Sequence, residues 1–298
     1  MDKEFLPGKG AEGYNVIMIS GEQPMDEVIE KTIKALQRRE IQGHVAANRD
    51  AARDIVVGLI PSEAVVGIGD SSSVRQIGAV DAIRAKGNRV INPFDMTKEV
   101  YDLQTNFDNL FWPCIEASIC DVFLTGTNGI TEDGKLVNVD GAGNRASGMF
   151  WGHPISIMVV GRNKISGNLE EAMDRVKNVV CPEHLKRKGA PAPCTKDGKC
   201  HDCVGKGKVC AVTTIIERRP VTTVAMHVVI VNEDLGLSWD RSWPAERINR
   251  IVALHEKFMC GCPLPLFVTR PGNTEELWKM VRAKKKFVWS DAEVEKEY

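Results

Sequence analysis

The fold class follows from one segment, Ala64-Val65-Val66-Gly67-Ile68-Gly69-Asp70-Ser71-Ser72-Ser73. Its first five residues form a short apolar run, and Pro61 ends the helix that we predict before it, so the run is typical of a buried strand. The small polar residues then turn the chain toward a helix that we expect to begin near Val74. A buried strand, a polar turn and a helix in this order indicate an α/β protein.

The same alternation continues on both sides of this segment. Apolar runs and amphipathic periodicity predict a mainly parallel sheet with helices on both faces, because hydrophobic strands alternate with helices. A Glu-Asp-Gly turn signal adds a hairpin within residues 130–138. We expect helices at residues 24–39, 48–60, 74–86, 169–179, 244–258 and 274–285, one or two more within 96–118, and strands at 44–46, 64–68, 89–92, 121–125, 155–160, 211–217 and 224–231.

Composition narrows the classes of protein. The 298 residues carry a net charge of -1 and are 43% hydrophobic, which suits a globular chain and gives no broad attraction to nucleic acid or an anionic membrane. The charged, Gly-rich start lacks the apolar core of a signal peptide, and no later segment is apolar enough for a membrane span. We therefore expect a cytoplasmic protein, in which nine cysteines are better explained as ligands, core residues or nucleophiles than as disulfides.

A cysteine-rich segment at residues 181–210 interrupts the pattern with Cys, Pro, Gly and Lys. It has few large apolar residues, so it cannot form a hydrophobic core unaided and needs another interaction to hold it in one conformation. Cys194, Cys200, Cys203 and Cys210 are separated by five, two and six residues. Four thiolates suit a 4Fe-4S cluster or tetrahedral zinc, and the uneven spacing favours the cluster over the paired Cys-x-x-Cys motifs of zinc ribbons. Free core cysteines are a third alternative, which the polar surroundings disfavour. Cys181 is a candidate fifth thiol, and Cys260 and Cys262 form a weaker candidate pair.

Two polar stretches are candidates for ligand binding. The turn after the strand at 64–68 presents backbone N–H groups to an anion, although helix capping by one serine is the alternative. In the second stretch, residues 126–145, Glu132 and Asp140 are candidates for general acid or base and Arg145 for a carboxylate clamp, the alternative being a pair of ordinary turns. His153 is a candidate to face the same cleft. The expected ligand-binding residues are Gly69, Asp70, Ser71, Ser72, Ser73, Thr127, Asn128, Asn138 and Asn144.

These residues resemble the LUD-domain family. The resemblance is carried by Val66 to Gly78, by Thr-Gly-Thr-Asn-Gly-Ile-Thr-Glu-Asp-Gly at 125–134, by Gly141 to Arg145, by Val160 to Ile165 and by Val231 to Gly236. It implies a fold similar to the NagB, ribose-phosphate isomerase and CoA-transferase group, with the cysteine-rich loop inserted. It divides the chain into an N-terminal extension (1–24), the LUD-like domain (25–236) and a C-terminal helical extension (237–298).

The family is named for lactate utilisation protein C, a component of a bacterial system that oxidises L-lactate beside iron–sulfur partner proteins. That protein generally lacks the cysteine loop, so this chain resembles the subgroup that carries it. We expect an iron–sulfur protein of organic-acid metabolism that takes a small anionic organic acid. Three alternatives stay open: a subunit or electron-transfer component, an enzyme on a small carboxylate or hydroxy acid, and a zinc-stabilised binding protein. A homo-oligomer is compatible with each.

Overall fold

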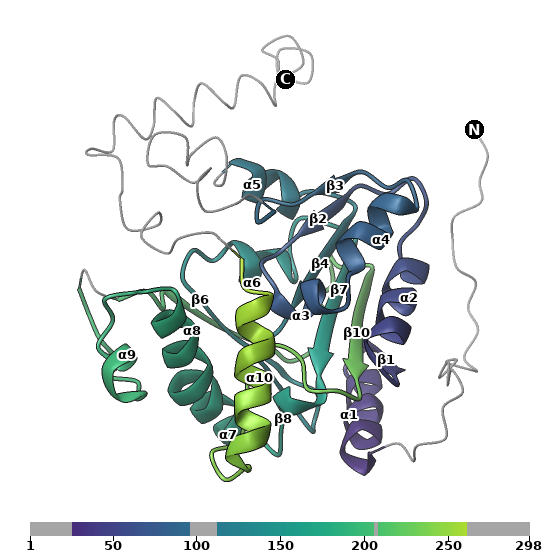
Figure 1. Cartoon of the computed structure of the whole chain (residues 1–298). Helices are drawn as coiled ribbons and strands as arrows, with labels where there is room; N and C mark the ends of the chain where they lie inside the picture. The colour runs from purple at the N-terminus through teal and green to yellow at the C-terminus, as the bar shows by residue number, and fades with distance from the viewer. Residues whose placement is uncertain (1–25, 96–111, 206–207, 261–298) are drawn as a thin grey trace, which may run out of the picture.

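A six-stranded sheet forms the centre of the molecule (Figure 1). The computed structural model describes residues 26–95, 112–205 and 208–260. Every neighbouring pair of strands in this sheet is parallel. Their spatial order is β1 (Gln42–Ala46), β10 (Ala225–Val231), β7 (Ile155–Gly161), β4 (Val122–Gly126), β2 (Val66–Ile68) and β3 (Val90–Ile91). The predicted α/β class with a mainly parallel sheet is therefore confirmed.

Both faces of the sheet are covered. One face packs against α2 (Arg49–Leu59), α3 (Ser72–Gln76) and α4 (Ala79–Ala85) through a continuous apolar cluster. The other face packs against α1 (Glu27–Arg38), whose Ile29, Ile33 and Leu36 recur at helical spacing and are buried. Because α1 has an apolar stripe only on that side, its charged residues remain in water.

A second sheet packs beside α1 and contains four strands, in the order β8 (Ile165–Ser166), β5 (Gly129–Thr131), β6 (Leu136–Asp140) and β9 (Val212–Ile216). The predicted hairpin is the antiparallel pair of β5 and β6. The sequence led us to expect residues 211–217 in the main sheet, whereas β9 pairs with β6 instead. The apolar pattern of β9 identifies a strand but does not identify its partner.

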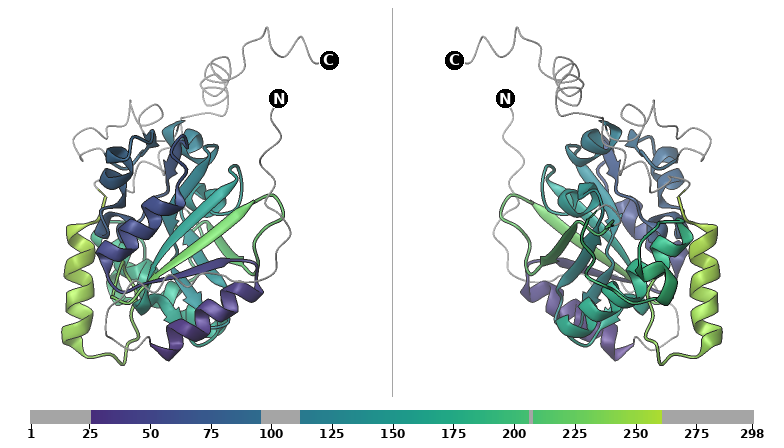
Figure 2. Two further views of the ribbon diagram at one scale, coloured as in Figure 1. Left: turned by 90° about the vertical axis from the view of Figure 1, so that its right-hand side faces the viewer. Right: turned by 90° about the vertical axis from the view of Figure 1, so that its left-hand side faces the viewer.

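The remaining helices lie around the cysteine-rich segment and the sheet edges. They are α5 (Trp112–Ser118), α6 (Asn144–Gly148), η3 (Arg162–Lys164), α7 (Leu169–Arg175), η4 (Val176–Val180), α8 (Cys181–Arg187), α9 (Cys194–Asp197) and α10 (Ala245–Lys257). Both views in Figure 2 place α10 at the periphery of the molecule. None of the helices in the described ranges is long and apolar enough to cross a membrane.

Two helix predictions differ from the structure. The helix expected at 74–86 is divided into α3 and α4 at Gly78, which has a φ of +67°. The helix expected to end at 179 continues through η4 into α8, although few large apolar residues follow Val180. Residues 96–111 and the helix expected at 274–285 lie outside the described residues.

Gly67 in β2 provides a test of how closely the helices pack on the sheet. A Cβ at this position would lie 1.9 Å from the carbonyl oxygen of Ala117 in α5, so the backbone itself must move. We expect Gly67→Ala to lower the free energy of unfolding by about 1–3 kcal/mol in urea denaturation followed by circular dichroism. The control is Gly58→Ala in α2, where no atom lies within 4 Å of the added Cβ. It should stabilise by roughly 0.5–1 kcal/mol, and equal effects of the two changes would contradict this packing.

Candidate functional site

A cavity of about 340 Å³ lies at the carboxyl edge of the main sheet. It is lined by the turn after β2, the turn after β4 and Lys164 in the segment after β7. The chain leaves β2 toward the edge strand β3 and leaves β4 toward β7 on the opposite side. Adjacent parallel strands whose connections diverge leave a crevice at their carboxyl ends, where ligands bind in open α/β sheets. The topology thus explains the position of the cavity.

The three serines after β2 have three different partners. Ser71 Oγ accepts a hydrogen bond from Val74 N at 3.3 Å and caps α3. Ser72 Oγ lies 3.1 Å from Nδ1 of His255, and Ser73 Oγ lies 3.3 Å from Nζ of Lys164. Capping, the alternative considered for this turn, therefore accounts for one serine. The five-residue α3 is too short for its dipole to dominate, so hydroxyl groups are what this turn offers to a ligand.

Asp70 and Gly69 occupy different sides of the same turn. Asp70 lines the cavity and accepts a hydrogen bond from Arg75 Nη2 at 2.8 Å. Burial raises the pKa of this carboxyl, but the charges of Arg75 and Lys188 more than offset it and hold the pKa well below its usual range. Gly69 is not among the lining residues, because its Cα faces Thr125 and Phe123 of β4.

Lys164 is the residue that the sequence prediction missed. Its side chain is buried, and Nζ donates to the carbonyl oxygen of Thr127 at 2.7 Å as well as facing Ser73. None of the ion pairs found in the described parts of the chain involves Lys164. Burial, with a smaller effect from the nearby Arg145, lowers the pKa of this amine to about 7. Lys164 lies shortly after the end of β7, as Asp70 does after β2 and Thr127 does directly after β4, and that placement was the available signal.

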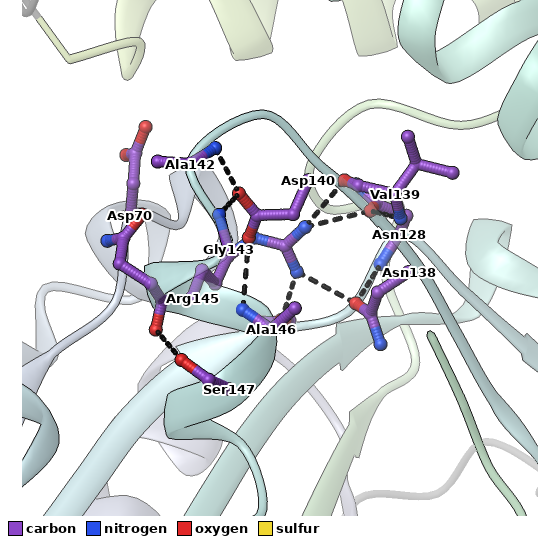
Figure 3. A network of polar contacts seen from close by, with 12 residues as sticks. Asp70, Asn128, Asn138, Val139, Asp140, Ala142, Gly143, Arg145, Ala146 and Ser147 are labelled. Carbon is purple, nitrogen blue, oxygen red and sulfur yellow. Dashed lines mark hydrogen bonds and ion pairs between the residues drawn. The ribbon is translucent and has the colours of Figure 1, made fainter. Parts of the chain in front are cut away.

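Arg145 is enclosed by acceptors from the chain (Figure 3). Nη1 donates to Asn138 Oδ1 at 2.7 Å and to the carbonyl of Gly126 at 3.4 Å. Nη2 donates to Asn128 Oδ1 and to the carbonyl of Val139, both at 2.9 Å. The four hydrogens of the two terminal nitrogens thus have four protein acceptors, and the side chain ties the turn after β4 to β6. The predicted carboxylate clamp would require some of these bonds to be exchanged for bonds to the ligand.

The two candidate acid–base residues lie in different places. Asp140 lines the cavity, but its carboxylate accepts hydrogen bonds from the backbone N–H groups of Ala142, Gly143 and Ala146 and closes the turn before α6 (Figure 3). Glu132 pairs with Lys31 of α1 at 2.6 Å and is not among the lining residues. These contacts match the turn alternative, and an acid–base role for either residue stays a prediction.

Of the predicted amide and hydroxyl residues, Thr127, Asn128 and Asn138 form one network with Arg145, whereas Asn144 donates to Cys114 Sγ. Asn138 Oδ1 accepts from Thr127 Oγ1 at 3.1 Å and from Asn128 N at 3.3 Å, in addition to Arg145. Thr127, Asn128 and Asn144 line the cavity, whereas Asn138 supports them from behind. His153 lies at the opposite, amino end of β7 and stacks on Phe123, so it does not face this cleft. The two ends of a parallel strand cannot share one crevice.

A second wall comes from α8, α10 and the residues that follow α10. Figure 1 shows the two helices side by side, and the rings of His184 and His255 lie 5.9 Å apart. Burial lowers the pKa of His184 to about 4 and that of His255 to about 3, so both imidazoles are neutral at pH 7. Cys260 Sγ lies 3.2 Å from Asp70 Oδ2, which joins this wall to the turn after β2. Cys262 lies outside the described residues.

The cysteine-rich segment contributes the third wall. Cys181 and Cys210 line the cavity and share a side-chain hydrogen bond, which raises the pKa of Cys181 and lowers that of Cys210 to about 7. Cys194 is buried beside Cys210. Burial and the nearby charges of Cys210, Cys203 and Cys200 raise the pKa of its thiol. Among the described residues no three such side chains are arranged to hold one metal ion. The sulfurs nevertheless share one neighbourhood, and a thiolate set of this kind suits iron–sulfur clusters and zinc.

Comparison with known proteins supports one assignment. A model of a family described as the LUD domain matches residues 29–231. No match was found among curated proteins or solved structures. The matched region contains all four predicted metal cysteines and the turns after β2, β4 and β7, while α10 follows it.

The buried amine makes the stability of the protein depend on pH. Between pH 7 and about 10, unfolded Lys164 binds a proton that the folded chain does not, so stability rises with pH. We expect the unfolding free energy of the natural chain, relative to Lys164→Met, to increase by up to about 1.4 kcal/mol per pH unit in this window. Urea denaturation at pH 7 and pH 9 measures it. Lys34→Met, which removes a side chain that is 63% exposed, should show no such slope; a flat difference for Lys164→Met would contradict the buried neutral amine.

Proposed function

The chain belongs to the LUD-domain family, and we propose that it is an iron–sulfur protein of organic-acid metabolism that binds a small, lactate-type acid in the cavity. The observation that supports this most strongly is the charge of the lining. Arg75, Arg145, Lys164, Lys188 and Lys208 are basic, whereas Asp70 and Asp140 are the acidic residues among the described lining. An organic anion would offset the excess of positive charge.

The size and burial of the cavity suit such a ligand. A volume of about 340 Å³ lies at the lower end of the range for small-molecule sites. Lys164 has no carboxylate partner within the described chain, and burying an unpaired charge is costly. A carboxylate that binds beside Nζ would supply the missing partner, and hydroxyl groups of the β2 turn are available for a 2-hydroxy group.

The position of the cysteines supports a cluster next to that ligand. Because Cys181 and Cys210 line the same cavity as Lys164, a cluster held by Cys194, Cys200, Cys203 and Cys210 would adjoin the bound acid. A cluster held there would supply electron transfer or Lewis-acid chemistry. The shared wall favours the enzyme alternative over a component that only transfers electrons to iron–sulfur partner proteins.

Ligand binding can be measured by isothermal titration calorimetry at low ionic strength with L-lactate, pyruvate and the neutral analogue lactamide. We expect both acids to bind and lactamide not to bind. Lys164→Met should weaken acid binding about tenfold or more, since a hydrogen bond to a charged group contributes about 1.5–3 kcal/mol. Lys34→Met is the matched control and should bind normally. Equal affinities in the two variants, or no binding of either acid, would contradict the proposal.

The cluster is tested by iron, zinc and acid-labile sulfide analysis with a visible spectrum on anaerobically purified protein. We expect about four irons and four sulfides per chain, with most of both lost in Cys203→Ser. Cys120→Ser is the control, because Cys120 hydrogen-bonds to the carbonyl of Ala117 beside the sheet and lies outside the predicted set. Stoichiometric zinc without sulfide would overturn the iron–sulfur assignment and favour the zinc-stabilised alternative.

A further inference from the structure

We propose that Lys164 is a catalytic residue that forms an imine with the carbonyl carbon of its ligand, which makes 2-oxo acids the substrate class of the cavity. The inference rests on the proposed function, because it assumes that a small organic acid enters the cavity. It goes further by assigning a covalent step to one amine.

The hydrogen bonds of Lys164 match a neutral amine. An ammonium group has three hydrogens to donate, whereas a neutral amine has two hydrogens and one lone pair. Two acceptors face Nζ, the carbonyl oxygen of Thr127 at 2.7 Å and the hydroxyl of Ser73 at 3.3 Å. The two hydrogens of a neutral amine suffice for these two contacts, and its lone pair is then left for a ligand. Because Lys164 also lines the cavity, a ligand there can meet this lone pair.

The electrostatic surroundings favour the neutral amine. Burial and the nearby Arg145 lower the pKa of Lys164 to about 7. No carboxylate of the described chain forms an ion pair with it, unlike Arg75, which pairs with Asp70. A lysine desolvated beside another cation is a recognised way to obtain an amine nucleophile at neutral pH.

Gly236 leaves the space beside Nζ free of side-chain atoms. A Cβ at this position would lie 2.7 Å from Nζ and 2.6 Å from Ser73 Oγ, and the φ of +67° at Gly236 disfavours any larger residue. The loop after β10 is held in place, since Gly236 N donates to Oε1 of Gln76 at 2.8 Å. A side chain at position 236 would therefore displace Nζ and Ser73 Oγ, so the glycine allows the amine to keep its position.

The proposed step needs no further reactant. The lone pair of Nζ attacks the carbonyl carbon of the 2-oxo acid, and the carbon–nitrogen double bond forms as the carbon–oxygen double bond breaks. Both amine hydrogens leave with the oxygen as one water molecule, so nothing is oxidised or reduced. Imine formation makes the carbon next to the former carbonyl easier to deprotonate. The carboxylate of the acid remains ionic and faces the basic lining.

Reductive trapping tests this step on the full-length protein. Pyruvate is added at pH 7 with sodium cyanoborohydride, and the modified lysines are identified by peptide mass spectrometry. Lys164 should carry the reduced pyruvyl adduct and should react on the order of a hundredfold faster than exposed Lys34, because burial lowers the pKa of the Lys164 amine to about 7. L-Lactate, which has no carbonyl, should give no adduct and should slow the labelling by competition.

The outcomes separate the inference from the function on which it rests. Pyruvate binding in calorimetry without an adduct on Lys164, or with labelling no faster than at Lys34, would overturn the imine and leave the organic-acid site standing. Absence of both binding and adduct would overturn both. Because the adduct is mapped on the natural chain, the result does not depend on whether a Lys164 variant folds.

Discussion

The site depends on one physical constraint: Lys164 is buried at the carboxyl edge of the main sheet with no carboxylate partner in the described chain. Removing a charged amine from water is costly, so Lys164 must either be neutral or have its positive charge offset by an anionic ligand. The carbonyl of Thr127, the hydroxyl of Ser73 and the close backbone at Gly236 fix where the amine can lie. These three groups come from the ends of β4, β2 and β10, so the parallel sheet itself assembles the site.

Arg145 links the second sheet to the cavity at the edge of the main sheet. Its guanidinium binds the turn after β4 and the end of β6 together, and Asn138 joins that network from β6. The charge that lowers the pKa of Lys164 beyond the effect of burial is therefore held in a fixed position. The cysteine-rich segment completes the enclosure through Cys181 and Cys210. The cavity thus adjoins both a buried amine and a group of thiols, which is the arrangement expected if an organic acid and a metal centre work together.

Local patterns predicted much of this molecule. The apolar runs identified β2, β4, β7 and β10, and the small polar residues after β2 and β4 marked two of the turns that line the cavity. Long-range partners were not predictable from these patterns. The strand pattern at 212–216 does not reveal that β9 pairs with β6, and the charge of Glu132 does not reveal that Lys31 neutralises it on another face. Lys164 was missed because a lone lysine in Gly161-Arg162-Asn163-Lys164 resembles a solvated turn; its place after a strand end was a signal, but the sequence does not show its burial.

The most direct test of this account is an NMR titration of the protein labelled with ¹³C at lysine Cε, with the Lys164 resonance assigned by its loss in Lys164→Met. The account predicts that Lys164 titrates with a pKa of about 7, well below the ordinary value for lysine. The same resonance should move when pyruvate is added. A Lys164 amine that titrates at the ordinary value for lysine, or a resonance that does not move with pyruvate, would contradict the account that this buried amine faces the ligand.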